Sequence, residues 1–175
     1  MAQAKAIPAV GQTMPGDPGR GVLHEGATGA FVLSRKPVSR GESARFATAT
    51  NRPAAVCRER ASVLRVLSPR DWKSPGFDQG DADPVVCVSM ADADSYARWH
   101  GQQTGRRYRL PTAAEARETA AEISGRAVSL WLRDCGSTCQ QRIAVGTSWR
   151  SKQAQRPLAI GRGYDDVGFR LVREL

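Results

Sequence analysis

The chain has 175 residues, which is a usual length for one domain and enough to build a hydrophobic core. No apolar run approaches the roughly 20 residues that cross a bilayer, so no membrane span is expected. Lys and Arg number 26 against 17 Asp and Glu, and the net charge is +9. The basic residues are scattered without a long basic block. We therefore expect no nucleic-acid interface, and favour an unidentified protein or an acidic ligand as partner.

The first part of the chain differs in composition from the rest. Residues 1–28 are rich in Pro, Gly and small side chains, which is typical of an arm or extended segment. Residues 29–175 are expected to form the folded domain. The N-terminus lacks the continuous apolar core of a signal peptide, which leaves two alternatives. The chain is cytoplasmic, or a leader or a longer upstream part has been removed.

An early helix is predicted from its end signals. Ser39-x-x-Glu42 is a capping box, and the helix should run from there to about Thr50. Asn51-Arg52-Pro53 should end it, because the residue before a proline disfavours helical backbone. A short strand is predicted just before this helix, at residues 31–33.

The stretch from Gln79 to Glu115 is the most informative part of the sequence. A buried strand is predicted at Val85–Val88, followed by a helix that Ser89-x-x-Asp92 caps. That helix should run from about Met90 to Gln102, and end at the Thr104-Gly105 turn. After a short strand at residues 108–110, a second cap, Thr112-x-x-Glu115, predicts another helix, extending to Ile123.

The C-terminal third is predicted to be mostly strand. Val128–Arg133 is a candidate strand, and alternation of apolar residues from Ile143 to Thr147 indicates another. Phe169–Val172 is the expected closing strand. With two main helices, Met90–Gln102 and Thr112–Ile123, and the early helix ending at Thr50 among several strands, the fold class is α+β, in one domain with much irregular loop.

Four motifs stand out along the chain: PVVCVS at 84–89 with the following helix, TGRRYRLPT at 104–112, GTSW at 146–149 and VGFRL at 167–171. In this order they resemble the motifs of the formylglycine-generating enzyme (sulfatase-modifying factor) family. The resemblance implies that family's C-type-lectin-like fold for residues 29–175. The segments at 37–46 and 70–77 resemble two further family motifs.

The same resemblance locates the family's catalytic centre. Active members bind copper(I) through two cysteines, placed two and seven residues after the Trp that corresponds to Trp149, and oxidise a substrate cysteine to formylglycine. Here those positions are Ser151 and Arg156. Neither is a soft ligand, so no copper site and no other cofactor is expected. Ser148 matches a family serine beside that site.

Other metal sites are not favoured either. The segment Arg126–Trp131 corresponds to the family's calcium-binding motif, but Ala127 and Leu130 replace its oxygen donors. Some relatives use iron(II) held by histidines, and this chain has only His24 and His100. Ala116 replaces a family Trp. The resemblance therefore implies a diverged member, a pseudoenzyme without catalytic residues.

The four cysteines admit two interpretations. We pair Cys57 with Cys87 and Cys135 with Cys139, which would indicate a periplasmic or extracellular protein, because disulfides persist in oxidising compartments. The alternative is four free thiols in a reducing cytoplasm.

Cations gather in sequence around the lost copper positions. If the family groove persists, they should face it and bind an anionic ligand, because arginine presents a planar donor fork. The candidate ligand residues are Ser148, Arg150, Ser151, Arg156 and Arg162. The alternative is that these arginines pair with Asp165, Asp166 and Glu174 and only solvate a surface loop.

The sequence thus leaves two functions open. The first is a non-catalytic module that binds a ligand or a protein. The second is an oxidoreductase of the formylglycine-generating or non-haem iron type that uses a different metal site. A regulatory or lipoprotein-associated domain cut from a longer chain is a third possibility.

Overall fold

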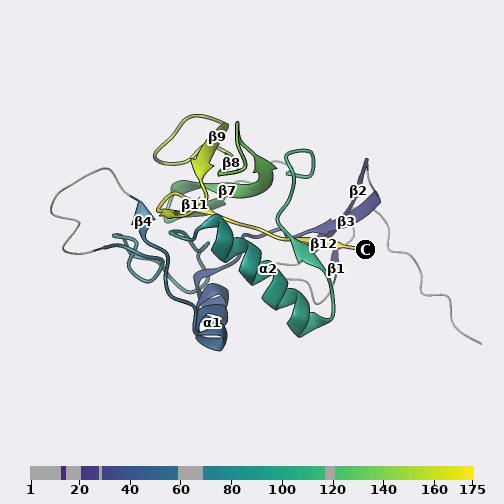
Figure 1. Cartoon of the computed structure of the whole chain (residues 1–175), viewed down its shortest axis with the longest axis horizontal. Coiled ribbons are helices and arrows are strands. Elements are labelled where there is room, and N and C mark those ends of the chain that lie inside the picture. The colour runs from purple at the N-terminus through teal and green to yellow at the C-terminus, as the bar shows by residue number, and fades with distance from the viewer. Residues whose placement is uncertain (1–12, 15–20, 28, 59–68, 117–120) are drawn as a thin grey trace, which may run out of the picture.

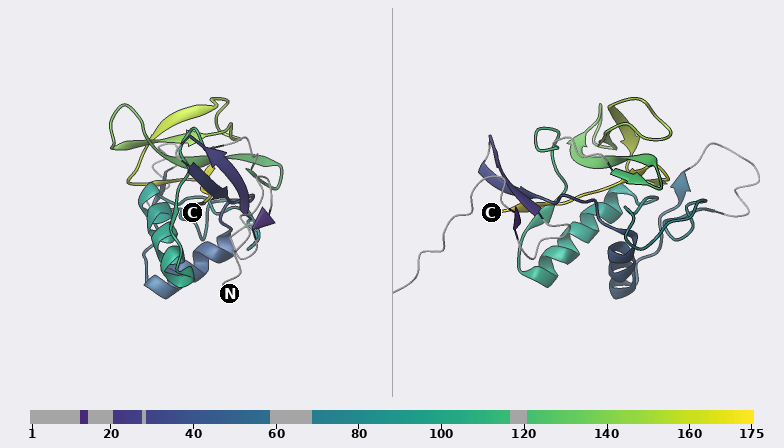
Figure 2. Two further views of the ribbon diagram at one scale, coloured as in Figure 1. Left: turned by 90° about the vertical axis from the view of Figure 1, so that its right-hand side faces the viewer. Right: turned by 180° about the vertical axis from the view of Figure 1, so that it is seen from behind.

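The structure is a computed structural model that describes residues 13–14, 21–27, 29–58, 69–116 and 121–175. It is a mixed fold of two helices and several short strands (Figure 1). Helices α1 and α2 lie on one side, and strands β7, β8 and β9 lie on the other. The chain that leads into the C-terminal strand β12 runs between them, and the turned views in Figure 2 show the same layering.

Helix α1 (Arg40–Thr50) forms where its end signals predict. The Ser39 hydroxyl accepts from the Glu42 amide, and the Glu42 carboxylate accepts from the Ser39 amide at 2.8 Å. Asn51 ends the helix in a left-handed conformation with φ of 50°. The capping box and the stop signal are both confirmed.

Helix α2 (Met90–Thr104) is also confirmed, with Ser89 and Asp92 forming the reciprocal cap. Gly105 ends it with φ of 66°. The helix buries Tyr96, whose ring meets those of Phe46 on α1 and Phe169 on the C-terminal segment. These aromatic contacts join both helices to the segment between the layers.

One antiparallel sheet has the order β1-β2-β3-β12-β5. The C-terminal strand therefore lies in the middle of the sheet, between strands far from it in sequence. The bounds are β1 (Thr13–Met14), β2 (Gly21–Gly26), β3 (Gly29–Leu33), β12 (Val172–Glu174) and β5 (Tyr108–Arg109). Since Val22–Gly26 of β2 pairs with β3, the sheet begins before the boundary at residue 28 that the sequence suggested.

The second sheet has the order β11-β7-β8-β9, and β6 also pairs with β7. The pairing of β11 with β7 is parallel, and so is that of β10 with β4 in a separate two-stranded ladder. The bounds are β4 (Cys57–Arg58), β6 (Ala121–Ile123), β7 (Arg126–Cys135), β8 (Gln141–Val145), β9 (Gln155–Ala159), β10 (Gly163–Tyr164) and β11 (Val167–Gly168).

The predicted helix from Thr112 to Ile123 is wrong over the residues that the structure describes. Residues 113–115 form a single turn, and Ala121–Ile123 is strand β6. Ser124 and Gly125, both with positive φ, make a two-residue turn that pairs β6 with β7. The Ser-Gly dipeptide was the available sequence signal for this hairpin.

The predicted strand at Val85–Val88 is buried as expected but is not a strand. Cys87 adopts φ of 60°, which breaks an extended ladder. Its amide donates instead to the Tyr164 carbonyl, and the Val85 amide donates to the Val38 carbonyl. The closing strand is likewise shorter than predicted, because only Val172 of Phe169–Val172 lies in β12.

One arginine in the C-terminal segment is buried. Arg170 is 2% exposed, and its three side-chain nitrogens have no hydrogen-bond partner among the described residues. Burial lowers the pKa of its guanidinium to about 10, so it remains charged at neutral pH. This cation is therefore counted in the net charge but is not available to a ligand at the surface.

Glu115 connects its turn to the neighbouring sheet. Its carboxylate accepts from the Thr112 amide, as a cap should, but it also takes a two-bond contact from the Arg109 guanidinium, at 2.6 and 2.7 Å. Burial raises the pKa of this carboxyl, but the bonds from Arg109 and Thr112 outweigh burial and hold it below its usual range. Arg109 also bonds Glu174 on β12.

We predict that this carboxylate stabilises the fold except in acid. Because the folded pKa lies below the unfolded one, its contribution is present above about pH 4.5 and is lost as pH falls through the folded pKa. Glu115→Gln should lower the unfolding free energy at pH 7 by about 1–3 kcal/mol. Urea unfolding at pH 7 and pH 3 should show less acid destabilisation in this variant than in wild type. The exposed control Glu25→Gln should match wild type, and equal acid losses in wild type and Glu115→Gln would contradict the prediction.

Candidate functional site

The residues around Trp149 form a tight turn after strand β8. The Ser148 amide donates to the Ser151 carbonyl at 2.8 Å, and the Ser151 amide donates to the Ser148 carbonyl and hydroxyl. The Trp149 amide donates to the Ala127 carbonyl at 2.9 Å. These bonds fix the turn against the start of β7.

Two consecutive aspartates lie beneath this turn. Asp165 and Asp166 are each 1% exposed, between β10 and β11. The parallel pairing of those strands with β4 and β7 holds them in place, and the Ser129 amide on β7 donates to the Asp166 carbonyl at 2.9 Å. Two acidic side chains are thus kept away from water. In this buried position each carboxylate requires a hydrogen-bond donor or a cation.

Arg156 on β9 supplies the cation for Asp166. Its guanidinium forms an ion pair with the Asp166 carboxylate, and the same nitrogen lies 3.3 Å from each of the Ser129 and Ser148 hydroxyls. The Ser148 hydroxyl donates to the Asp166 carboxylate at 2.5 Å. This hydroxyl is buried and bridges the Asp166 carboxylate and the Arg156 guanidinium.

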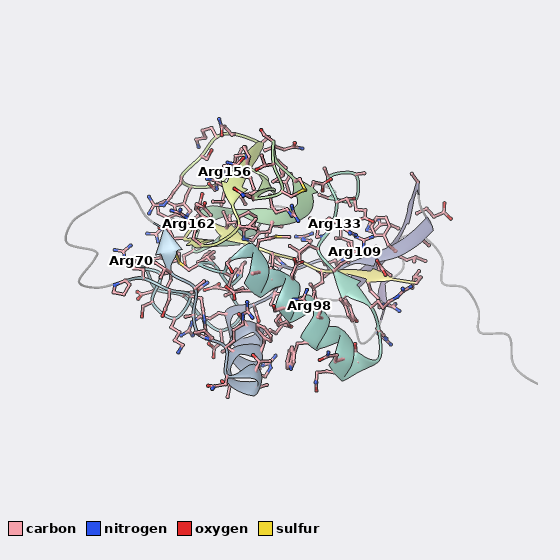
Figure 3. All side chains as sticks on the ribbon, in the orientation of Figure 1. Arg70, Arg98, Arg109, Arg133, Arg156 and Arg162 are labelled. Carbon is pink, nitrogen blue, oxygen red and sulfur yellow. A yellow bond between two sulfur atoms is a disulfide. The ribbon has the colours of Figure 1, made fainter. Side chains whose placement is uncertain are left out.

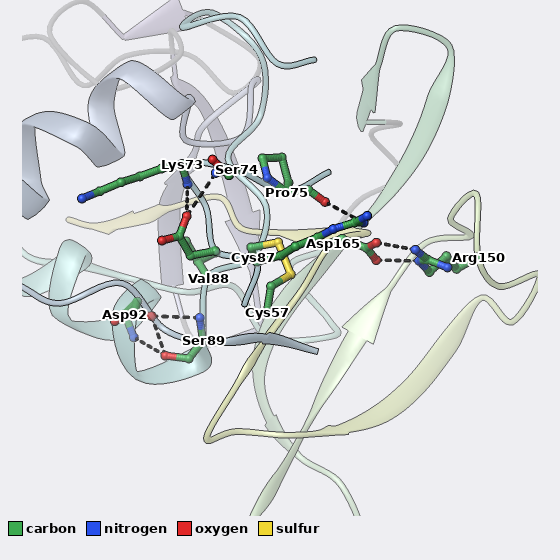
Figure 4. Close-up of a disulfide and its surroundings, with 12 residues drawn as sticks. Cys57, Lys73, Ser74, Pro75, Cys87, Val88, Ser89, Asp92, Arg150 and Asp165 are labelled. Atoms are coloured by element: carbon green, nitrogen blue, oxygen red, sulfur yellow. Dashed lines mark hydrogen bonds and ion pairs between the residues drawn. A yellow bond between two sulfur atoms is a disulfide. The ribbon is translucent and has the colours of Figure 1, made fainter. Parts of the chain in front are cut away.

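Arg150 supplies the cation for Asp165. Its guanidinium meets the carboxylate with two nitrogens, a planar two-bond contact of the kind that arginine favours. Bonding to Asp165 raises the pKa of Arg150. Figure 4 shows this pair together with the Cys57–Cys87 disulfide, and the Cys87 amide donates to Tyr164, the residue before Asp165.

Trp149 extends the cluster to the surface. It is 37% exposed, and the Arg150 guanidinium lies 3.9 Å from the centre of its ring. On this surface Arg126 also lies close to two rings, at 5.0 Å from Phe77 and 5.6 Å from Trp149. The two rings are nearly perpendicular, with centres 6.2 Å apart. We call Phe77, Arg126 and Trp149 the aromatic corner.

The structure therefore brings together four of the five candidate ligand residues. Ser148, Ser151, Arg150 and Arg156 share one cluster, whereas Arg162 makes no hydrogen bond or ion pair with it in the described part of the chain (Figure 3 labels Arg156 and Arg162). Arg150 and Arg156 pair with Asp165 and Asp166, as the alternative in the sequence analysis proposed. Those two aspartates are buried, however, and do not lie on a surface loop. Glu174 pairs with Arg109 and Arg107 instead.

Sequence comparison gives the family. A profile described as the sulfatase-modifying factor enzyme 1-like domain matches residues 11–129, which is more than half of the chain. The chain belongs to this family. None of the curated protein sequences matches it.

Three solved structures are similar to this member of the sulfatase-modifying factor family. PvdO from Pseudomonas aeruginosa has a TM-score of 0.65 at 22% identity, covering 93% of this chain and 90% of that one. CarF has a TM-score of 0.56 at 18% identity, with coverages of 84% and 87%. Treponema denticola variable protein 1 has a TM-score of 0.55 at 11% identity, with coverages of 97% and 94%. The fold is the formylglycine-generating-enzyme type, which is C-type-lectin-like, in a single α+β domain.

The residues of this family member do not fit the copper(I) site that the resemblance implies. Arg156, at one cysteine position, has no lone pair to donate, and Ser151, at the other, offers only a hard hydroxyl. All four cysteines of the chain are in disulfides. The Arg156 guanidinium donates to oxygen acceptors on Ser129, Ser148 and Asp166. A positively charged side chain that cannot bind a metal ion therefore lies at this position.

The calcium and iron alternatives find no ligand set in the described residues. Around Ser129 the hydroxyl donates to the Gly146 carbonyl and accepts from Arg156, while Ala127 and Leu130 offer no side-chain oxygen. His24 stacks on Phe31, and His100 stacks on Tyr96 in α2, so the two histidines serve different elements. Within the ranges that the structure covers, no group of three or more His, Cys, Asp or Glu side chains is arranged to hold a metal ion.

The two disulfides are those that the sequence analysis paired, Cys57–Cys87 and Cys135–Cys139, and they differ in environment. The first is buried and closes a separation of 30 residues, which contributes on the order of 3–4 kcal/mol in the chain-entropy model. The second is exposed at the β7–β8 connection, where the Arg142 guanidinium lies 2.8 Å from the Cys135 sulfur. No helix among the described residues is long and apolar enough to cross a membrane.

Arg156→Gln should destabilise the protein strongly. The substitution leaves the buried Asp166 carboxylate without its cation, and breaking such a pair costs about 3–5 kcal/mol. Arg126→Gln removes the same charge from an exposed position that has no acidic partner among the described residues, so it should cost less than about 1 kcal/mol. Thermal and urea unfolding of both variants measure the difference. Similar losses in the two variants would show that Arg156 is not a structural cation.

The exposed disulfide should be reduced before the buried one. Arg142 stabilises the thiolate that leaves from Cys135, and solvent reaches that bond directly. Native protein treated with rising dithiothreitol, then alkylated and mapped by mass spectrometry, should label Cys135 and Cys139 first. Four alkylatable thiols in freshly purified protein would contradict the disulfides themselves, and earlier labelling of Cys57 and Cys87 would contradict the order.

Proposed function

We propose that this protein is a non-catalytic member of the sulfatase-modifying factor family, a module that binds a ligand or a protein through the face around Trp149. The observation that carries the proposal is the Arg156 guanidinium, which pairs with buried Asp166 where the family resemblance would place a catalytic cysteine. Ser151 at the other position makes backbone turn contacts. Oxidation of a substrate cysteine through this centre has no soft ligand to support it.

A rigid support for this face favours binding as its role. Trp149 is exposed, yet its amide is tied to Ala127 and its ring is covered on one side by Arg150. Arg150 is itself held by Asp165, which lies in the buried segment between β10 and β11. Binding costs less when the contacting side chains are ordered beforehand, and loops on a rigid frame are common binding surfaces.

The disulfides bear on where the module works. One buried and one exposed disulfide are stable in an oxidising compartment, and we propose the periplasm or the extracellular space as that compartment. The exposed bond supports this most, because a reducing cytoplasm would open it.

The catalytic alternative is tested directly. Purified protein is loaded with copper(I), then with iron(II), and analysed for bound metal; it is also incubated with a Cys-x-Pro-x-Arg peptide, copper(I), oxygen and reductant. We expect no stoichiometric metal and no formylglycine, with an active family enzyme as positive control. One equivalent of tightly bound copper or iron with oxygen consumption, or peptide turnover at the rate of the control, would establish an enzyme and refute the proposal.

A further inference from the structure

The arginines on the Trp149 face are not equivalent. Arg150 and Arg156 are each neutralised by a buried aspartate, so moving either toward a ligand would leave a buried carboxylate unpaired. The positive charges of Arg150 and Arg156 are thus neutralised within the protein. A ligand that approaches this face must therefore be recognised by another group.

Arg126 is a cation on this face that remains available to a ligand. It is exposed, and it has no carboxylate partner among the residues that the structure describes. Its guanidinium is nevertheless ordered, because it lies within cation–π distance of both Phe77 and Trp149. An oriented guanidinium without a counter-ion is a ready partner for a carboxylate.

The aromatic corner is built by three separate segments. Phe77 follows Gly76, which has φ of 94°, and a Cβ there would lie 2.0 Å from an Arg70 side-chain nitrogen. Glycine is favoured here because an L side chain is strained at this positive φ, and this backbone conformation leads the loop to Phe77 at the corner. Arg126 starts β7 directly after the Ser124-Gly125 turn, and Ala127 binds the Trp149 amide. The three side chains are thus placed by backbone contacts rather than by a bound partner.

We propose that the aromatic corner binds an acidic segment of another protein, with Arg126 pairing to an Asp or Glu side chain and a neighbouring apolar side chain packing on the exposed part of Trp149. This inference rests on the proposed binding function and names its ligand class. The chemistry needed is one carboxylate beside one apolar group. Planar two-bond contact by Arg126 makes the carboxylate specific, and Trp149 supplies apolar area next to it.

The charge distribution favours a peptide over a polyanion. A nucleic acid or a sulfated polysaccharide is held by a continuous track of free cations. On this face the track is interrupted, because Arg150 and Arg156 are paired with aspartates. A single oriented guanidinium in an aromatic corner matches a single carboxylate instead.

The test is selection of random heptapeptides displayed on phage against the immobilised full chain. Enriched peptides should carry Asp or Glu next to an aromatic or aliphatic residue. Synthetic copies with a fluorescein label are then measured by fluorescence anisotropy. We expect Arg126→Gln to weaken binding at least tenfold, Arg126→Lys to weaken it less, and Trp149→Ala to weaken it about as much as Arg126→Gln. Replacing the acidic residue of the peptide by its amide should have the same effect as Arg126→Gln.

Arg45→Gln is the matched control. Arg45 is exposed on α1, so this substitution removes the same charge away from the aromatic corner. It should bind like wild type, and unfolding curves of all variants should confirm that each is folded. A heparin oligosaccharide and a single-stranded oligonucleotide are measured in parallel, and both should bind more weakly than the peptides and without dependence on Arg126.

The outcomes separate the two proposals. Peptides that depend on Trp149 but bind Arg126→Gln as well as wild type would overturn the inference and leave the binding module standing. Arg126-dependent binding of heparin or the oligonucleotide, tighter than any peptide, would overturn the peptide class. Enrichment of no peptide, with no binding of either polyanion, would overturn the inference and count against the binding function itself.

Discussion

The buried pair Asp165-Asp166 is the constraint on which this end of the molecule depends. The two carboxylates lie between strands β10 and β11, so they connect the ladder with β4 to the sheet that contains β7. Two charges out of water require compensation, and each receives one arginine from the β8–β9 region. The Trp149 turn, the Ser129 hydroxyl and strand β9 are all tied to the same acidic centre.

The Arg156 guanidinium holds this end of the fold together. It donates to Asp166 and contacts two serine hydroxyls, so it crosslinks three segments of chain. Its donors are fixed in one plane, so it holds geometry as well as charge. The surface above it carries the exposed ring of Trp149.

The same pairing changes how the net charge of +9 is interpreted. Several arginines are neutralised inside the structure, such as Arg109 between Glu115 and Glu174, and Arg170 is buried. Net charge counts these cations equally with exposed ones, whereas a ligand meets only the accessible ones. The positions with unpaired, oriented cations are therefore a better guide to recognition than the total.

The sequence by itself determined helices α1 and α2 and located strands β3, β5, β7 and β8. Helix caps and turns act over three or four residues, so local sequence contains their physics, as Ser39, Ser89 and Gly105 show. The cap bond between Thr112 and Glu115 forms, but the predicted helix does not reach Ile123, because Ala121–Ile123 pairs with β7 instead.

Only the tertiary structure decided which arginines pair with a buried aspartate and which have no acidic partner among the described residues. Arg150 and Arg156 meet their aspartates across 15 and 10 residues, through strand pairings that no local pattern encodes. Phe77, Arg126 and Trp149 come from three distant segments, and their meeting depends on the Gly76 backbone and the bond from Trp149 to Ala127. Long-range packing sets the electrostatic partner of each side chain, and residue type alone does not.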